Sequence, residues 1–133
     1  MKAKSATPSF QEAKSPFTYA GLQAGIPAST VRGLETQGLR REDIRMVIPD
    51  RTLERRIAAG DNLKPDEADG IARLLRVVQA ARDLFENDEN ADLFLRSPHP
   101  MLGGQTAMQT ACTELGAREV ETIIGRIAHG VFS

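Results

Sequence analysis

The sequence predicts an all-α chain with four or more helices. Apolar residues recur at helical spacing along several segments, capping residues flank these segments, and no alternating pattern of apolar and polar residues indicates strands. Of the 133 residues, 41% are hydrophobic but only 5% are aromatic, which is typical of a mostly helical protein. This length suits one compact domain or two very small ones.

The amino-terminal third contains weak signals before its first clear helix. Residues 1–16 are rich in Lys, Ser, Ala, Thr and Pro, which predicts a flexible arm. The arm is mildly basic, so it could contact phosphate, but a solvated tail is the favoured interpretation. Gly21 and Gly25 interrupt residues 17–26 and Pro27 follows them, so the pattern does not decide whether a helix forms there. Ser29 is then expected to cap a helix over residues 30–37, which Gly38 ends.

Two short helices joined by a tight turn are predicted over residues 41–47 and 51–59. This arrangement is typical of a helix-turn-helix unit, in which the second helix lies in the major groove of DNA. Arginine suits this place because its planar guanidinium group can donate two hydrogen bonds to guanine or phosphate. The side chains expected to face DNA are Arg51, Thr52, Arg55 and Arg56. The alternative is a solvated charged face, and Glu54 weakens the case for DNA.

The longest predicted helix runs from Pro65 to about Phe85, because proline is tolerated in a first helical turn. Arginines are expected on the side opposite its apolar stripe, which consists of Ile71, Leu74, Leu75, Val78, Ala81 and Phe85. The pair Asn87-Asp88 breaks this helix, and a short helix over residues 91–95 follows. That short helix contains Leu93, Phe94 and Leu95.

The stretch from residue 98 to 133 contains a tight loop over residues 101–106, followed by two short amphipathic helices. The adjacent Gly103 and Gly104 indicate either positive φ angles or a close approach by a partner. Thr106 is the expected cap of the next helix. The apolar face of the last helix consists of Val120, Ile123, Ile124 and Ile127. After Gly130, the apolar Val131 and Phe132 either fold back onto the core or face a partner.

The reactive side chains argue against an enzyme. Cys112 is the single cysteine, and His99 and His129 are the two histidines. They cannot form an internal disulfide, a thiolate cluster or a helical histidine pair for a metal, so we expect no catalytic residue, metal or cofactor. No run of about 18 apolar residues and no secretory signal is present, so we expect a cytoplasmic protein without a membrane partner.

Charge is unevenly distributed along the chain. Residues 28–82 hold eleven Lys and Arg against nine Asp and Glu, whereas residues 83–133 hold three against eight. This asymmetry is compatible with one half facing phosphate and the other half facing a positively charged partner.

Several pieces, in this order and spacing, resemble a known family: RTLERR at 51–56, LKPDEAD at 63–69 leading into Arg73-Leu74, LGGQT at 102–106, GAREVE at 116–121 and RIAHGV at 126–131. The family is that of antitoxins whose toxin-binding domain is called Xre/MbcA/ParS, which are partners of RES-domain toxins. The resemblance spans nearly everything after residue 30. RES toxins resemble ADP-ribosyltransferases and act on NAD, either consuming it or transferring its ADP-ribose.

The resemblance implies an arm over residues 1–16, a DNA-binding and dimerising helix-turn-helix region over residues 17–64, and a helical toxin-binding domain over residues 65–133. It implies a protein that occludes the active site of a RES-domain toxin and, as a homodimer on operator DNA, represses its own operon. The expected toxin-binding residues are Leu102, Gly103, Gly104, Gln105, Thr106, His129, Gly130, Val131, Phe132 and Ser133. Either this loop or this end could be the inhibitory element. The alternative function is a stand-alone helix-turn-helix regulator without a toxin partner.

Overall fold

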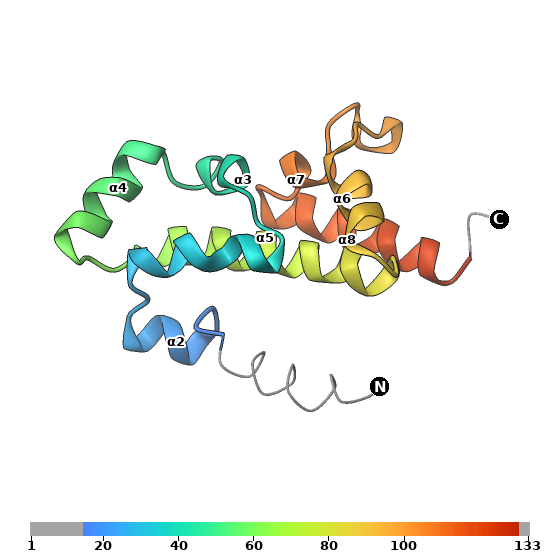
Figure 1. Ribbon diagram of the computed structural model, residues 1–133. Coiled ribbons are helices and arrows are strands. Elements are labelled where there is room, and N and C mark those ends of the chain that lie inside the picture. Colours follow the sequence, from blue (N-terminus) through green and yellow to red (C-terminus); the bar gives the residue numbers. More distant parts are fainter. Residues whose placement is uncertain (1–14, 131–133) are drawn as a thin grey trace.

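The computed structural model describes residues 15–130, which form helices and no β-strand (Figure 1). The predicted all-α class is therefore confirmed for this range, whereas almost all of the predicted arm lies outside the described residues. In order, the elements are α2 (Tyr19–Ala24), the 3₁₀ helix η1 (Ala28–Gln37), α3 (Arg41–Arg45), α4 (Asp50–Ala59), α5 (Pro65–Leu84), α6 (Asp88–Arg96), the 3₁₀ helix η2 (Pro100–Leu102), α7 (Ala107–Thr110) and α8 (Glu114–Ala128).

The central element is the predicted long helix, α5, which spans 20 residues and begins with Pro65. Helices α6 and α8 and the 3₁₀ helix η1 pack against it, while α4 lies toward one end of the molecule and η2 toward the other (Figure 1). Its most deeply buried side chains are Ile71, Leu74, Val77, Val78 and Ala81. Because these residues face both halves of the chain, one continuous hydrophobic core extends from Ile26 to Ile124.

The first long helical segment, η1, differs from its prediction. It begins at Ala28 rather than residue 30, and no side chain caps it, so the prediction that Ser29 is its cap is wrong. The reason is tertiary: the Ala28 N–H donates to the Asp61 carbonyl (2.9 Å) and the Leu63 N–H donates to the Ile26 carbonyl (2.8 Å). These bonds fix the backbone before Ser29, and the helix therefore starts earlier.

The short helix predicted over residues 91–95 is longer, because α6 spans Asp88–Arg96. Helix α5 ends at Leu84, shortly before the predicted break at Asn87-Asp88, and the Asn87 side chain accepts from the Asn90 N–H (2.8 Å) and caps α6. Of the three apolar residues assigned to this helix, Leu95 is buried whereas Leu93 is 66% exposed. None of the helices within residues 15–130 has the length and apolar character needed to cross a membrane.

Candidate functional site

Helix α4, the second helix of the predicted DNA-binding unit, carries two arginines that remain available for a partner. Arg51 and Arg55 lie four residues apart on one face of the helix, and both are exposed. Within residues 15–130 neither forms an ion pair or a side-chain hydrogen bond. Thr52 is half-buried, and Leu53 packs into the core. The helix-turn-helix assignment of α3 and α4 stays a prediction.

Arg56 does not share this surface, and the prediction that it points outward is wrong. Its guanidinium pairs with the Glu67 carboxylate in the first turn of α5, and its side chain is 11% exposed. The same carboxylate accepts from the Lys64 N–H (2.8 Å), so Arg56 ties α4 to the start of α5. The hydrogen bond from Arg56 holds the pKa of Glu67 below its usual range, outweighing the burial that raises it.

We expect the substitution Glu67→Gln to reduce the loss of stability on acidification. The pKa of Glu67 in the folded chain lies below its ordinary 4.5. Its contribution to the free energy of unfolding is therefore present above that pH and is lost as the pH falls through the lower, folded value. Urea unfolding at pH 7 and at about pH 3 measures the free energy of unfolding of wild type and variant. The difference between the two should be smaller at the lower pH. Glu119→Gln, at an exposed position, is the control. If its difference from wild type in free energy of unfolding fell equally between the two pH values, the effect could not be assigned to the pair of Glu67 with Arg56.

The acidic side chains nearest this arginine face are already engaged. Glu54 pairs with Arg32 of η1 (2.8 Å), and Asp50 pairs with Arg45 of α3 (2.9 Å). Their negative charge is therefore largely neutralised within the chain, and it opposes an approaching phosphate less than the sequence alone indicates.

The loop at Leu102–Thr106 has the conformation that its glycines predict. Gly103 and Gly104 have φ angles of +67° and +85°, which L side chains rarely adopt, and a Cβ at either position would meet no atom within 4 Å. The glycines therefore serve the turn itself and leave its outer side open. The His99 N–H donates to the Gln105 carbonyl (3.0 Å) and the Gly104 N–H donates to the His99 carbonyl (2.9 Å), so the loop is closed at its base.

Thr106 caps α7 as predicted, because its hydroxyl accepts from the Gln109 N–H (3.0 Å) while the Gln109 side chain accepts from the Thr106 N–H (2.9 Å). A rigid element thus follows the loop directly.

The last helix, α8, confirms most of its predicted apolar face: Val120, Ile123 and Ile124 are buried and Ile127 is half-buried. His129 follows the helix, and Gly130 has a φ of +72°. The predicted tail contacts of Val131, Phe132 and Ser133 lie outside the described residues and stay a prediction.

The histidines and the cysteine occupy structural positions. His99 Nε2 donates to the Phe94 carbonyl (2.7 Å), and His129 Nδ1 donates to the Gly125 carbonyl (2.7 Å). Burial raises the pKa of the Cys112 thiol, which makes it a poorer nucleophile. In the described part of the chain, no three His, Cys, Asp or Glu side chains gather in a way that could hold a metal ion.

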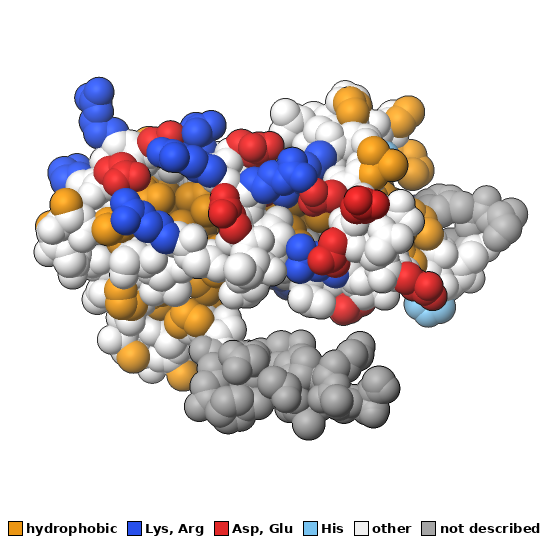
Figure 2. Space-filling view, in the orientation of Figure 1, with side chains coloured by type: hydrophobic (Ala, Val, Ile, Leu, Met, Phe, Trp, Pro, Cys, Tyr) orange, Lys and Arg blue, Asp and Glu red, His pale blue; other side chains and the backbone are white. Residues whose placement is uncertain are grey.

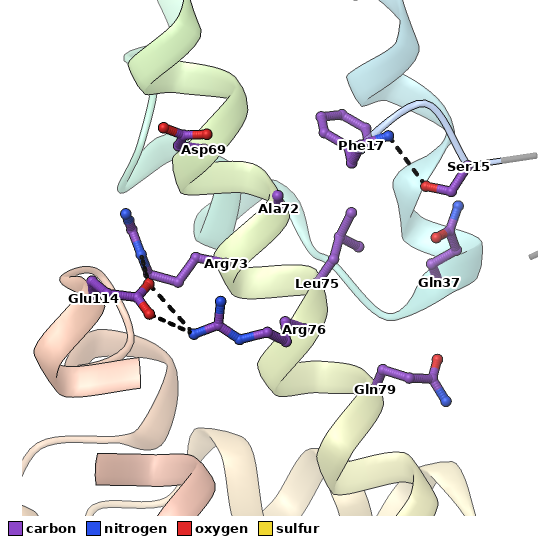
Figure 3. A pocket seen from close by; sticks show the side chains of 10 residues that line it. All are labelled: Ser15, Phe17, Gln37, Asp69, Ala72, Arg73, Leu75, Arg76, Gln79 and Glu114. Carbon is purple, nitrogen blue, oxygen red and sulfur yellow. Dashed lines mark hydrogen bonds and ion pairs between the residues drawn. The ribbon is translucent and has the colours of Figure 1, made fainter. Parts of the chain in front are cut away.

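An ion-pair cluster between α5 and α8 was not predicted from the sequence. Figure 3 shows it at the edge of an open groove of about 740 Å³, which lies between Phe17 and α5. The Glu114 carboxylate accepts from Arg73 (3.3 Å) and Arg76 (3.2 Å). A hydrogen bond from Arg118, followed by those from Arg73 and Arg76, lowers the pKa of Glu114. The sequence signal for this cluster was the expected placement of arginines on the side of α5 opposite its apolar stripe.

The charge asymmetry of the sequence is partly cancelled by pairing across the fold. Arginines of the basic stretch pair with acids of the acidic stretch, as Arg76 does with Glu121 (2.8 Å) and as Arg40 does with Asp92. Figure 2 accordingly shows basic and acidic side chains next to one another on the visible face. Fewer acidic residues are therefore free to attract a positively charged partner than the composition suggests.

Comparison with known proteins gives consistent matches. A family model described as the antitoxin Xre/MbcA/ParS C-terminal toxin-binding domain matches residues 80–130. A protein of Photorhabdus laumondii named "Antitoxin Xre" is 33% identical over 131 residues, which cover 96% of this chain and 88% of that protein. Proteins of the same name are 42% identical in Yersinia enterocolitica, over 65% of this chain, and 33% identical in Pseudomonas putida, over 63% of this chain. The matched stretches span 59% and 53% of those two proteins.

Proposed function

The chain belongs to the Xre/MbcA/ParS family of antitoxins, and we propose that it binds and neutralises a cognate toxin through residues 65–133. The observation that carries this proposal is the match of residues 80–130 to the toxin-binding domain of the family. The proposed partner is a RES-domain toxin that consumes NAD or transfers ADP-ribose. In this proposal the chain supplies binding, and the chemistry on NAD belongs to the toxin.

The proposed mechanism is occlusion of the toxin's active site by the Leu102–Thr106 loop or by residues 129–133. The loop is suited to this role because it projects from a hydrogen-bonded base and its two glycines have open space around them. A preformed loop loses little conformational entropy on binding, which favours affinity. The tail supplies Phe132, and an apolar anchor of this size contributes a few kcal/mol when it is fully buried, on the order of 2–3.

Deletion of residues 130–133 is expected to release toxicity in cells that co-express the toxin, while folding and DNA binding stay near wild type. The last buried side chain of α8 is Ile124, so the deletion removes none of the described core. Growth and cellular NAD content are the measurements, and Phe132→Ala should give a partial release. If the truncated chain still protects cells and still blocks NAD turnover, the tail is not the inhibitor. Gly104→Val, which forces a side chain into a φ of +85°, then tests the loop.

We further propose that the chain represses its own operon as a homodimer, with Arg51, Thr52 and Arg55 facing operator DNA. The exposure of the two arginines and their lack of ion pairs within residues 15–130 support this role. A two-fold pair of modules contacts two half-sites about one helical turn apart, which multiplies the affinity of one small module. Arg56 is left out of this surface because it is engaged by Glu67.

The second candidate function is a transcriptional regulator without a toxin partner. The arginine face of α4 supports it as well as it supports an autoregulating antitoxin. The gene context discriminates between the two, because an antitoxin is expected beside a reading frame for a RES-domain protein. Co-expression with that protein, followed by size-exclusion chromatography with mass determination, should yield a stable complex. A chain that elutes alone would favour the regulator.

A further inference from the structure

Two large apolar side chains lie exposed on neighbouring elements inside the family-matched region. Leu93 of α6 is 66% exposed and Met101 of η2 is 57% exposed. Figure 2 shows hydrophobic side chains gathered at this end of the molecule, over α6 and η2. Single exposed apolar residues are common on soluble proteins, but a contiguous group indicates a binding surface. We name the group formed by Leu93, Phe94, Met101 and Leu102 the α6–η2 patch.

The α6–η2 patch rests on a fixed support. Phe94 packs between Phe85 and His99, with ring centroids 5.5 Å and 4.9 Å apart. His99 also donates from Nε2 to the Phe94 carbonyl (2.7 Å), and its own carbonyl accepts from the Leu102 N–H (2.9 Å). These contacts join η2 to α6, so the exposed side chains stand on a preformed base. Preformed surfaces lose less entropy when they bind a partner.

The surroundings of the patch narrow the choice of partner. Its residues all lie within residues 80–130, which match a toxin-binding domain. Leu102 belongs both to the patch and to the proposed Leu102–Thr106 contact, so the two surfaces are continuous. Two acids of α6 are paired inside the chain, Asp92 with Arg96 (3.2 Å) and Asp88 with Arg82 (3.5 Å), whereas Glu89, one turn before Leu93, is exposed and forms no ion pair within residues 15–130. A partner surface over Leu93 would therefore meet one unpaired acid, and a basic group at the edge of an apolar partner surface would complement Glu89.

We propose that the α6–η2 patch is the anchor of the toxin complex, which fills an apolar hollow on the toxin outside its active site. This inference rests on the proposed function and divides it into two parts: the patch supplies affinity, and the loop or the tail supplies inhibition. Apolar side chains at the centre of an interface carry most of the binding free energy, whereas an occluding element needs only to be held in place.

The test is the double substitution Leu93→Ser and Met101→Ser, measured against the RES-domain toxin that the proposed function requires. Burial of each side chain contributes roughly tenfold in affinity, so the double variant should bind about 100-fold more weakly by calorimetry. At saturating concentration it should still block NAD turnover completely. The melting temperature should not change, since both side chains are already exposed. Leu115→Ser, which alters an apolar residue 82% exposed on α8 outside the patch, is the matched control and should bind like wild type.

The outcomes separate this inference from the proposed function. If wild type itself does not bind the RES-domain protein, the proposed function fails and the inference fails with it. If wild type binds and the double variant binds equally well, or if Leu115→Ser weakens binding as much, the proposed function stands and the anchor is overturned. A double variant that binds but cannot inhibit at saturation would place the patch in the inhibitory element. A lower mass of the free chain on substitution would assign the patch to self-association instead.

Discussion

Arg96→Met is expected to lower the free energy of unfolding by about 3 kcal/mol, because it leaves a buried carboxylate without its counter-charge. Asp43 of α3 is 1% exposed, and its two carboxylate oxygens accept from the Arg96 guanidinium at 2.7 Å and 2.8 Å. In the variant, Asp43 would keep the bond from the Arg40 backbone N–H (2.8 Å) but would lose its counter-charge. We place the effect at the low end for buried pairs because the Arg96 side chain remains 16% exposed. Urea unfolding measures it.

The control is Arg118→Met, which removes an ion pair with Glu114 on the surface of α8. The Arg118 side chain is 73% exposed, and such pairs contribute about 0.5 kcal/mol or less. The double variant Asp43→Asn, Arg96→Met should recover part of the lost stability, since it no longer buries an unpaired charge. Equal effects of Arg96→Met and Arg118→Met would show that the contact between α3 and α6 does not depend on this pair.

The parts of the fold that were predicted correctly depend on signals that act within a few residues. Thr106 caps α7 because its hydroxyl reaches the N–H three residues ahead, and Gly38 ends η1 because its φ of +92° suits glycine. The apolar stripe of α5 predicted its buried face because residues that recur at helical spacing lie on one side of the helix, and an apolar side packs against the core. Where a distant segment intervenes, as Asp61 does at Ala28, the predicted boundary moved.

The partners of charged side chains could not be predicted in this way. Arg55 and Arg56 are adjacent and identical in chemistry, yet successive helical positions differ in direction by about 100°. That rotation leaves Arg55 exposed and turns Arg56 toward Glu67, eleven residues further along the chain. Arg73 likewise meets Glu114 across 41 residues. Composition records how many arginines a helix has, but it does not record which of them have partners in the folded chain.

For the candidate site, the sequence predicted the conformation of the glycine turn but not the exposure of Leu93. The positive φ angles of Gly103 and Gly104 follow from the sequence, because adjacent glycines indicate a turn that other residues disfavour. The exposure of Leu93 does not follow, because an apolar residue in a short helix is more often buried. In the fold, Ala91 and Leu95 form the buried side of α6, and Leu93, between them in sequence, points away from the core.

Replacing both Arg51 and Arg55 with Ala is expected to abolish operator binding at physiological salt. Each arginine that contacts a base or a phosphate contributes about 1–3 kcal/mol, and a homodimer presents each of them twice. The combined loss is therefore about 4 kcal/mol or more, which corresponds to roughly a 1000-fold weaker affinity. The fold should be unaffected, since both side chains are exposed and have no ion pair within residues 15–130.

Titration of the operator at several salt concentrations would then assign the role of each arginine. A single variant that loses a phosphate contact lowers the slope of log affinity against log salt by about 0.9 for each contact removed. A variant that loses a base contact leaves the slope unchanged and relaxes the sequence preference. The matched control is Arg118→Ala with Arg126→Ala, which removes the same charge from the exposed side of α8. If this control weakens binding as much as the α4 variant does, net charge and not the α4 surface determines affinity. Unchanged binding by the α4 variant would exclude that helix as the DNA-facing element.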